Sequence, residues 1–513
     1  MERKWWTLIA VSVAMFMLLL DITVVNVALP DIQHSLHSSF ADLQWVVNAY
    51  SLTLAAFLLT AGSLSDLLGR RRVFVAGLIV FTLSSAACGL ADSPLTLNLA
   101  RAVQGLGGAM MFATSLALIA DAFHGKERGI AFGVYGGVIG AAVAVGPVIG
   151  GLITSGIGWE WIFFVNVPIG IGAVALTLSQ VDESRDPDAR GVDWAGLITF
   201  SGSLFLLVFA LVQGNEKGWG STEIVSFLVG SLVLIVLFLI VELRQERPML
   251  DLTLFKKPAF TGASIAALAI SSSMFSMFLY LTLYIQDVLG YTPLQAGLRF
   301  LPVTVISFVV APISGRLSVR VPMRALIGGG LLLVSAGLLA MTAIDPSSDW
   351  TTLIPGFLLA GAGIGMLNPP LASTAVGVVH HSRSGMASGI NNTFRQVGIA
   401  TGVAGLGAIF QHEVVQNTTS ALANAQQHVF INAGTLKGLV VSGAVRPFAA
   451  HRPGGDVLLH AYRVGFTEAF TTILLIASGI ALVGSVLSFV LVRSKDFVSS
   501  YEGAPEAEAA VAA

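Results

Sequence analysis

Two charged residues lie inside stretches of the sequence that are otherwise apolar. Asp21 lies about nine residues before Pro30, which places its carboxylate roughly 13 Å below the outer end of a membrane-spanning helix. Arg101 lies about 10 Å inside the outer end of a second helix at the same rise per residue. The depths match, so contact between the two side chains is possible. Ionisable side chains at this depth are costly in a bilayer and usually functional.

The chemistry that suits such a pair is reversible proton binding. Burial disfavours an ionised carboxylate, whereas a nearby guanidinium favours it. A conformational change that alters the hydration of Asp21 or its distance from Arg101 would therefore couple proton binding to conformation. A static ion pair that only locks two helices together is the alternative reading. We predict that Asp21 and Arg101 are the proton-coupling residues.

A short loop between two apolar stretches carries three consecutive arginines. The loop is too short for anything but a tight hairpin, and its basic residues lie at one membrane face. We predict that it forms a cytoplasmic gate, at the end of a span and away from a midplane cavity. The predicted gate residues are Gly62, Asp66, Gly69, Arg70 and Arg71.

A third group of residues is rich in glycine and contains a proline inside an apolar stretch. Glycine lets helix backbones approach closely, and proline removes a backbone hydrogen bond. The residues are Gly146, Pro147, Gly150 and Gly151. Close helix packing with no mechanistic role is the alternative interpretation.

Polar side chains inside other apolar stretches are candidates for a substrate cavity. Such groups are costly in lipid, so we expect them to face a cavity, with hydrogen bonding between helices as the alternative. The candidates are Asn26, Gln104, Asn391, Asn392, Arg395 and Gln396.

The composition indicates that the elements positioning these residues are membrane helices. The chain of 513 residues is 55% hydrophobic and 11% charged, whereas soluble proteins carry about 25% charged residues. The net charge of −2 gives no reason to expect a nucleic-acid partner. The single cysteine, Cys88, excludes an intramolecular disulfide. No phosphate-binding loop or convincing metal-ligand set is present, the histidines His34, His37, His380 and His381 lying in predicted loops.

Apolar runs of about 20 residues predict roughly 14 helical spans. We place them at Trp5–Leu29, Gln44–Leu64, Val73–Leu90, Leu95–Ala120, Gly129–Leu152, Trp161–Leu178, Trp194–Gln213, Glu223–Val241, Phe260–Ile285, Leu294–Leu317, Arg324–Ala343, Thr351–Val376, Ala387–Phe410 and Phe466–Val492. With this topology most of the 27 Lys and Arg residues fall on one side of the bilayer. By the positive-inside rule that side is the cytoplasm, and both termini are cytoplasmic.

A weak internal repeat predicts two six-helix halves. Gly62, Leu64 and Ser65, followed by Arg71, recur at the same offsets as Gly315, Leu317 and Ser318, followed by Arg324. The predicted organisation is an N-terminal half at 1–180, a linker with two extra helices at 181–258, a C-terminal half at 259–495 with a long outer loop at 411–465, and a cytoplasmic tail at 496–513.

Several of these motifs resemble those of the major facilitator superfamily. The hairpin from Gly62 to Arg72 resembles its loop between spans 2 and 3, and the segment Leu20–Pro30 resembles the first span of its 14-span drug:proton antiporters of the EmrB/QacA type. The segment Arg101–Ala109 resembles the fourth-span motif, and Gly146–Gly151 resembles the antiporter motif of exporters. In the C-terminal part, Tyr284–Gly297 and Ser388–Gly398 resemble the loop between spans 9 and 10 and span 13.

The resemblance implies an all-α membrane transporter and not an enzyme. It implies proton-coupled export of amphipathic, drug-like compounds by alternating access, driven by the proton gradient without a cofactor or metal, from the cytoplasmic membrane of a bacterium. Between Phe260 and Phe410 the only acidic residues are Asp287, Asp345 and Asp349, which argues against a divalent cationic substrate. A dedicated exporter of one metabolite, siderophore or lipid is the main alternative. An importer and a non-transporting receptor or scaffold are disfavoured by the Gly146–Gly151 motif and by the buried charges, respectively.

Overall fold

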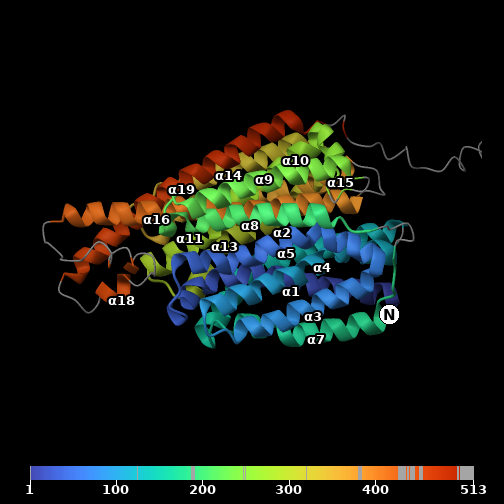
Figure 1. Ribbon diagram of the computed structural model, residues 1–513, viewed down its shortest axis with the longest axis horizontal. Coiled ribbons are helices and arrows are strands. Elements are labelled where there is room, and N and C mark those ends of the chain that lie inside the picture. Colours follow the sequence, from blue (N-terminus) through green and yellow to red (C-terminus); the bar gives the residue numbers. More distant parts are fainter. Residues whose placement is uncertain are drawn as a thin grey trace, which may run out of the picture.

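The protein is a bundle of long helices that run in roughly the same direction (Figure 1). The computed structural model describes residues 2–123, 125–185, 191–245, 248, 250–318, 320–378, 384–425, 435, 438–439, 445–449, 454–493 and 496. Regular structure in these residues is helical throughout. The predicted tail beyond residue 496, most of the segment 426–453, and His380 and His381 lie outside the described residues.

The first group of helices runs from the N-terminus to the charged linker. Its members are α1 (Arg3–Ser35), α2 (Phe40–Leu68), α3 (Arg70–Gly89), α4 (Pro94–Ala122), α5 (Gly125–Gly156), α6 (Trp161–Phe164) and α7 (Asn166–Gln180). Helix starts carry the expected caps: the Ser39 hydroxyl accepts from the Asp42 amide, and Ser93 precedes Pro94 at the start of α4. The core pairs are α2 with α4, α3 with α4, α1 with α5, and α3 with α7.

Two further helices, α8 (Trp194–Lys217) and α9 (Thr222–Arg244), form a hairpin after the linker. The hydroxyls of Ser203 and Ser231 hold them together, because each donates a 2.9 Å hydrogen bond to the other residue's carbonyl oxygen. The helix α8 also packs against α2 of the first group and against α16 of the second. The hairpin therefore lies along the line where the two groups meet.

The second group follows the hairpin. Its members are the 3-10 helix η1 (Leu252–Lys256), α10 (Pro258–Ile270), the π-helix η2 (Ser271–Phe275), α11 (Ser276–Leu283), the π-helix η3 (Tyr284–Val288), α12 (Pro293–Arg299), α13 (Leu301–Leu317), α14 (Met323–Met341), the 3-10 helix η4 (Trp350–Leu353), α15 (Ile354–Gly377), α16 (Ser384–Ala423), α18 (Val445–Ala449) and α19 (Gly455–Leu491). Here α15 packs against α13 and α14, and α19 packs against α14 and α16.

Twelve helices in the described residues are long and apolar enough to cross a membrane, and a bent pair within α5 makes up to thirteen. The bend of 40° lies between Ala142 and Ala144, close to Pro147, whose missing N–H weakens the helix there. The remaining predicted span, Ala387–Phe410, lies within α16, which carries several polar residues and does not meet the same criterion. The total of 14 spans therefore stays a prediction.

Two helix boundaries differ from those predicted around the long outer segment. The helix α16 continues past Phe410 to Ala423, and α19 begins at Gly455, before the predicted start at Phe466. Both ends of the predicted outer loop 411–465 are therefore helical. Hydropathy did not predict these helical ends, because they contain polar residues. A helix can continue beyond the bilayer, where lipid no longer requires apolar side chains.

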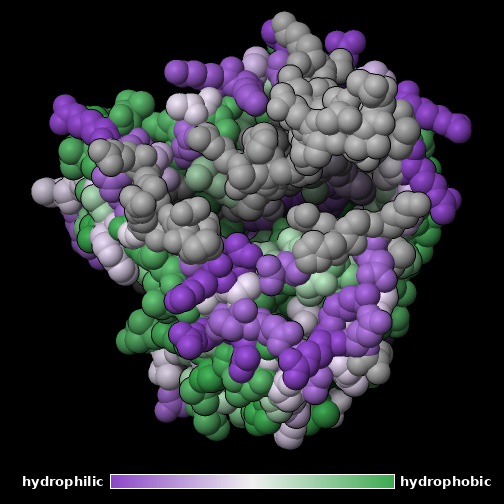
Figure 2. Space-filling model, turned by 90° about the vertical axis from the view of Figure 1, so that its right-hand side faces the viewer, coloured by the Kyte–Doolittle hydropathy of each residue, from purple (hydrophilic) through white to green (hydrophobic). Residues whose placement is uncertain are grey.

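The end of the bundle at which α1 begins is strongly polar. Arg3 forms a 2.9 Å ion pair with Asp182, and the Arg70 amide donates a 2.8 Å hydrogen bond to the Ser184 carbonyl, so the starts of α1 and α3 meet the linker after α7. Figure 2 shows hydrophilic side chains over this end, hydrophobic side chains around its sides, and a hollow near its middle. The band of apolar side chains suits contact with lipid.

Candidate functional site

The centre of the candidate site is a buried ion pair between α1 and α4. The Arg101 Nη1 atom lies 2.5 Å from Asp21 Oδ2, and the exposed fractions of these side chains are 2% and 0%. The structure thus brings together the two residues that were matched by depth in the sequence. Removing two charges from water is costly unless further hydrogen bonds satisfy them.

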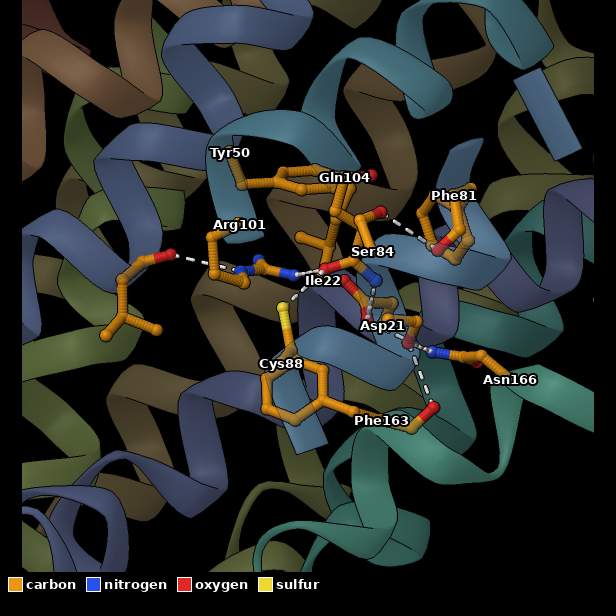
Figure 3. A network of polar contacts seen from close by, with 12 residues as sticks. Asp21, Ile22, Tyr50, Phe81, Ser84, Cys88, Arg101, Gln104, Phe163 and Asn166 are labelled. Atoms are coloured by element: carbon orange, nitrogen blue, oxygen red, sulfur yellow. Dashed lines mark hydrogen bonds and ion pairs between the residues drawn. The ribbon is translucent and has the colours of Figure 1, made fainter. Parts of the chain in front are cut away.

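Two amide side chains complete the shell around Asp21 (Figure 3). Gln104 donates from Nε2 to Asp21 Oδ1 at 2.9 Å, and its Oε1 accepts from Arg101 Nη1 at 2.7 Å. Asn166, the first residue of α7, donates to the same Asp21 oxygen at 3.2 Å. The carboxylate therefore accepts hydrogen bonds from three donors on two helices other than its own.

The guanidinium of Arg101 is held from α2 as well. Its Nε donates to the Val46 carbonyl at 3.2 Å, and its Cζ lies 4.3 Å from the centre of the Tyr50 ring. A cation above an aromatic face is stabilised by the ring's electron density. Arg101 consequently connects α1, α2 and α4, so a movement of any of these helices changes its contacts.

Sequence reasoning did not select Asn166 for this site. The residue lies near the start of the predicted span Trp161–Leu178. Its position as a polar side chain at the start of an apolar helix was the available signal. Its amide nitrogen also donates to Ser85 Oγ at 3.1 Å, which ties α3 to the same network.

Gln104 belongs to this network and not to an open cavity wall. The residue is fully buried, and both atoms of its amide group are used by Asp21 and Arg101. The other cavity candidate of the first group, Asn26, is half-buried and donates to Ile22 of its own helix at 3.2 Å.

The hairpin between α2 and α3 forms a second polar cluster. Asp66 pairs with Arg70 one helical turn later at 3.2 Å. Gly69 connects the helices with φ +110°, a backbone conformation that favours glycine, and a Cβ there would collide with the Glu183 carboxylate.

Glu183 accepts from the Arg71 amide at 3.0 Å, and Arg71 Nη2 donates to the Leu178 carbonyl at 3.2 Å. The arginine loop is therefore bound to the segment that follows α7. The sequence analysis did not predict this contact. The remaining predicted gate residue, Gly62, has open space around its α-carbon.

The glycines of α5 allow two close helix contacts on different faces. A Cβ at Gly146 would overlap Thr23 of α1, and one at Gly150 would lie 3.0 Å from the Val24 Cα. On the other face, a Cβ at Gly151 would lie 2.5 Å from the Pro293 carbonyl oxygen, and the Pro147 carbonyl lies against Gly297. This motif therefore packs α5 against α1 of its own group and against α12 of the second group.

The predicted polar residues of α16 have separate environments. Asn391 is buried and donates to the Ala263 carbonyl of α10 at 3.3 Å, and Asn392 donates to Ser388 of its own helix at 3.0 Å. Arg395 is half-buried and donates to Asn368 of α15 at 2.8 Å. Gln396 is half-buried, and its Oε1 has no hydrogen-bond partner among the described residues.

Comparisons with known proteins agree with this architecture. A sequence model of the Major Facilitator Superfamily matches residues 11–403. The chain is 39% identical to the multidrug resistance protein Stp of Mycobacterium tuberculosis, over 79% of this chain and 75% of that protein. It is 33% identical to the tetracenomycin C resistance and export protein of Streptomyces glaucescens, over 95% of this chain and 91% of that protein.

Solved structures share the fold at low sequence identity. The crystal structure of a bacterial homolog of the human lysosomal transporter Spinster, inward-facing and occupied, superposes with a TM-score of 0.64 at 18% identity. The alignment covers 96% of this chain and 98% of that one. A peptide transporter bound to sulfate gives a TM-score of 0.61 at 14% identity, with 94% and 93% covered. These likenesses concern the fold alone.

Proposed function

This chain belongs to the major facilitator superfamily, and we propose that it is a proton-coupled exporter of amphipathic, drug-like compounds. The proposal draws on its similarity to a multidrug resistance protein and to an antibiotic resistance and export protein. The observation that supports proton coupling is the buried Asp21–Arg101 pair. We infer that this ionisable pair exchanges a proton only when its helices move.

The proposed coupling step is competition between a proton and Arg101 for the Asp21 carboxylate. In this arrangement the Asp21 carboxylate has a counter-ion, Arg101 at 2.5 Å, and accepts from two amide donors. Withdrawal of Arg101 would leave a buried carboxylate without its counter-ion, which favours protonation. Binding of a proton from outside and its release inside then accompany opposite conformations, while substrate moves outward.

The arrangement of contacts supports alternating access around a central cavity. Gln286 of η3 donates to the Val27 carbonyl of α1 at 2.7 Å, and the Leu294 amide donates to Ser155 at the end of α5 at 3.0 Å. Gln44 of α2 donates to the Val403 carbonyl of α16 at 2.8 Å. These bonds join the two helix groups toward the end where α1 and α5 finish, whereas the opposite end is hollowed (Figure 2). We assign this conformation as inward-facing.

The proposed location is the cytoplasmic membrane of a bacterium, with both termini in the cytoplasm. The basic start of α1 and the arginines at the start of α3 lie at the hollowed end, which the positive-inside rule assigns to the cytoplasm. The polar linker residues Asp182 and Glu183 meet these basic residues at the same end.

The test is efflux of fluorescent substrates from energised bacterial cells that lack their main endogenous pumps. We expect the expressed protein to lower intracellular dye, and a protonophore to abolish that effect. A panel of unrelated amphipathic dyes and antibiotics separates a multidrug pump from a dedicated exporter of one metabolite, siderophore or lipid. Efflux that persists without a proton gradient would refute the coupling, and no efflux of any compound would refute export.

A further inference from the structure

Arg395 is a cation in the interior of the second helix group. It lies roughly 17 Å along α16 from the start of that helix at Ser384, at 1.5 Å per residue. The side chain is half-buried, and its Nη2 atom donates to Asn368 Oδ1 of α15 at 2.8 Å. A guanidinium has five N–H donors, so this single bond leaves most of its capacity for other partners.

Among the described residues, the carboxylates of the second group lie away from the depth of Arg395. Between Phe260 and Phe410 the sequence contains only Asp287, Asp345 and Asp349 as acidic residues, and the later ones as far as the end of α19 are Glu413, 18 residues further along α16, and Asp456 and Glu468 in the first half of α19. Asp287 belongs to η3, and Asp345 and Asp349 lie between α14 and η4, at the end opposite the hollow. The ion pairs formed by the described residues do not include Arg395. In the first group, Asp21 is already paired with Arg101.

Two prolines follow Asn368 within α15, which continues as one helix to Gly377. Pro369 and Pro370 lack the backbone N–H groups that would bond to Gly365 and Met366 one turn earlier. The Met366 carbonyl accepts instead from the Ser314 hydroxyl of α13 at 2.6 Å. Asn368 thus lies where α15 lacks two backbone N–H groups, beside a guanidinium that forms no ion pair with the described residues.

We propose that Arg395, positioned by Asn368, binds an acidic group of the exported compound. The substrates would then include amphipathic molecules that carry a carboxylate, which can accept two parallel hydrogen bonds from a guanidinium. Because Asn368 Oδ1 faces Arg395, its amide nitrogen remains as a further donor to the bound anion. This inference rests on the proposed export function, since it names a class of substrate for that cavity.

The test compares one amphipathic acid with its neutral ester on the purified full-length protein. Dansyl-phenylalanine and its methyl ester share the same fluorescent, apolar body and differ in the carboxylate. We expect the wild-type protein to bind the acid at least tenfold more tightly than the ester. Arg395→Gln should remove this preference by weakening binding of the acid alone, and Arg395→Lys should retain part of it.

Two further variants keep the test decisive. Asn368→Asp has nearly the same shape and supplies an internal counter-ion, so it should abolish the preference for the acid even if Arg395→Gln does not fold. Arg493→Gln removes an exposed positive charge at the end of α19 and should leave both affinities unchanged. Equal affinities of the wild-type protein for acid and ester would overturn the proposal, as would equal losses of both in Arg395→Gln and Asn368→Asp.

Binding to the purified protein needs no proton gradient, so this result is independent of export. If the acid preference depends on Arg395 but cells export neither probe, the binding site stands and the proposed function fails. If cells export both probes equally well and Arg395→Gln changes neither, the export function stands and the acidic-substrate inference fails.

Discussion

The carboxylate of Asp21 is nearly saturated with hydrogen-bond donors. An ionised carboxylate offers about four acceptor positions, and Arg101, Gln104 and Asn166 fill three of them. A proton on Asp21 would remove the negative charge that attracts Arg101. Protonation would therefore weaken the Asp21–Arg101 contact, which is the competition that the proposed coupling needs.

Asp21→Asn should abolish proton-driven efflux while the protein still inserts in the membrane. The asparagine cannot change its charge, and it leaves Arg101 buried without its counter-ion. Loss of one partner of a buried pair typically destabilises a protein by about 3–5 kcal/mol, so thermal stability should fall too. Dye efflux would be measured at matched expression.

Asp92→Asn provides the matched control for that substitution. Asp92 is exposed between α3 and α4 and undergoes the same chemical change. It should transport like the wild-type protein. Normal proton-driven efflux by Asp21→Asn would remove Asp21 from the coupling mechanism.

The sequence predicted the ion pair but not the shell around it. The depths of Asp21 and Arg101 follow from counting residues along two helices, and a charge in an apolar stretch is conspicuous. Asn166 and Glu183 were not identified because their contacts depend on how α7 and the linker are rotated against α1 and α3. Residue spacing within one helix does not determine that rotation.

At the scale of elements, the hairpin between α2 and α3 is held in place by polar contacts. Asp66 and Arg70 span its turn, and Glu183 binds the backbone of Arg71 from the segment after α7. These contacts lie at the polar end of the bundle, far from the Asp21 network. We therefore expect them to control the conformational cycle without contacting the substrate.

Asp66→Ala should slow transport while leaving substrate affinity near normal. The substitution breaks the 3.2 Å pair with Arg70 and so changes the relative stability of the inward-facing and outward-facing states. Turnover would be measured in proteoliposomes and affinity in detergent. Asp121→Ala serves as a control, because it removes an exposed carboxylate near the end of α4. A large loss of affinity with unchanged turnover would contradict the gating role.

Most helices could be predicted from hydropathy, and the exceptions have physical causes. Apolar runs located the ends of α1 to α4 to within six residues, because lipid requires continuous apolar side chains. The predicted span Trp161–Leu178 is divided into α6 and α7 at Val165, and Phe260–Ile285 contains the π-helix η2 and ends inside the π-helix η3. Ser272 of η2 donates to the Leu268 carbonyl at 2.8 Å, and Ser276, the first residue of α11, donates to the Ser271 carbonyl at 2.9 Å. Such local rearrangements leave the hydropathy pattern unchanged.

At the scale of the whole molecule, the two helix groups should separate at the end where Ser155 meets Leu294. Cysteines at both positions, in a Cys88→Ala background, could be joined by a short methanethiosulfonate cross-linker. We expect the cross-link to stop transport and dithiothreitol to restore it, because the Ser155–Leu294 contact must open in the outward-facing state.

A second cysteine pair controls for the chemistry of the cross-linker. Tyr291 and Asp349 both belong to the second group, and the half-buried Tyr291 donates a 2.7 Å hydrogen bond to the exposed Asp349. Cross-linking that pair should leave transport largely intact. Full activity of the cross-linked Ser155→Cys/Leu294→Cys protein would be inconsistent with opening at this end.

The hairpin of α8 and α9 is the remaining question at this scale, since it lies between the two groups in sequence and along their junction in space. The helix α8 packs against α2 and α16, and Asn215 donates to the Ala408 carbonyl at 2.5 Å. The hairpin contributes no residue to the Asp21 network. We therefore interpret it as a support that spans the junction and not as part of the coupling machinery.

Replacing Trp194–Val241 with a flexible linker should leave a transport core that inserts correctly and retains proton-coupled efflux. Removing two spans preserves the orientation of the second group, and the lost packing against α2 and α16 should lower stability by roughly 1–3 kcal/mol, the usual scale of destabilising changes. Asn215→Ala, which removes the bonds to Ala408, Gln411 and Trp219 but keeps both helices, should show a smaller loss of stability with normal efflux. Insertion, thermal stability and efflux would be measured for both variants. A deletion variant that is stable and correctly oriented yet inactive would place α8 and α9 within the transport mechanism, because the junction would then need them to move.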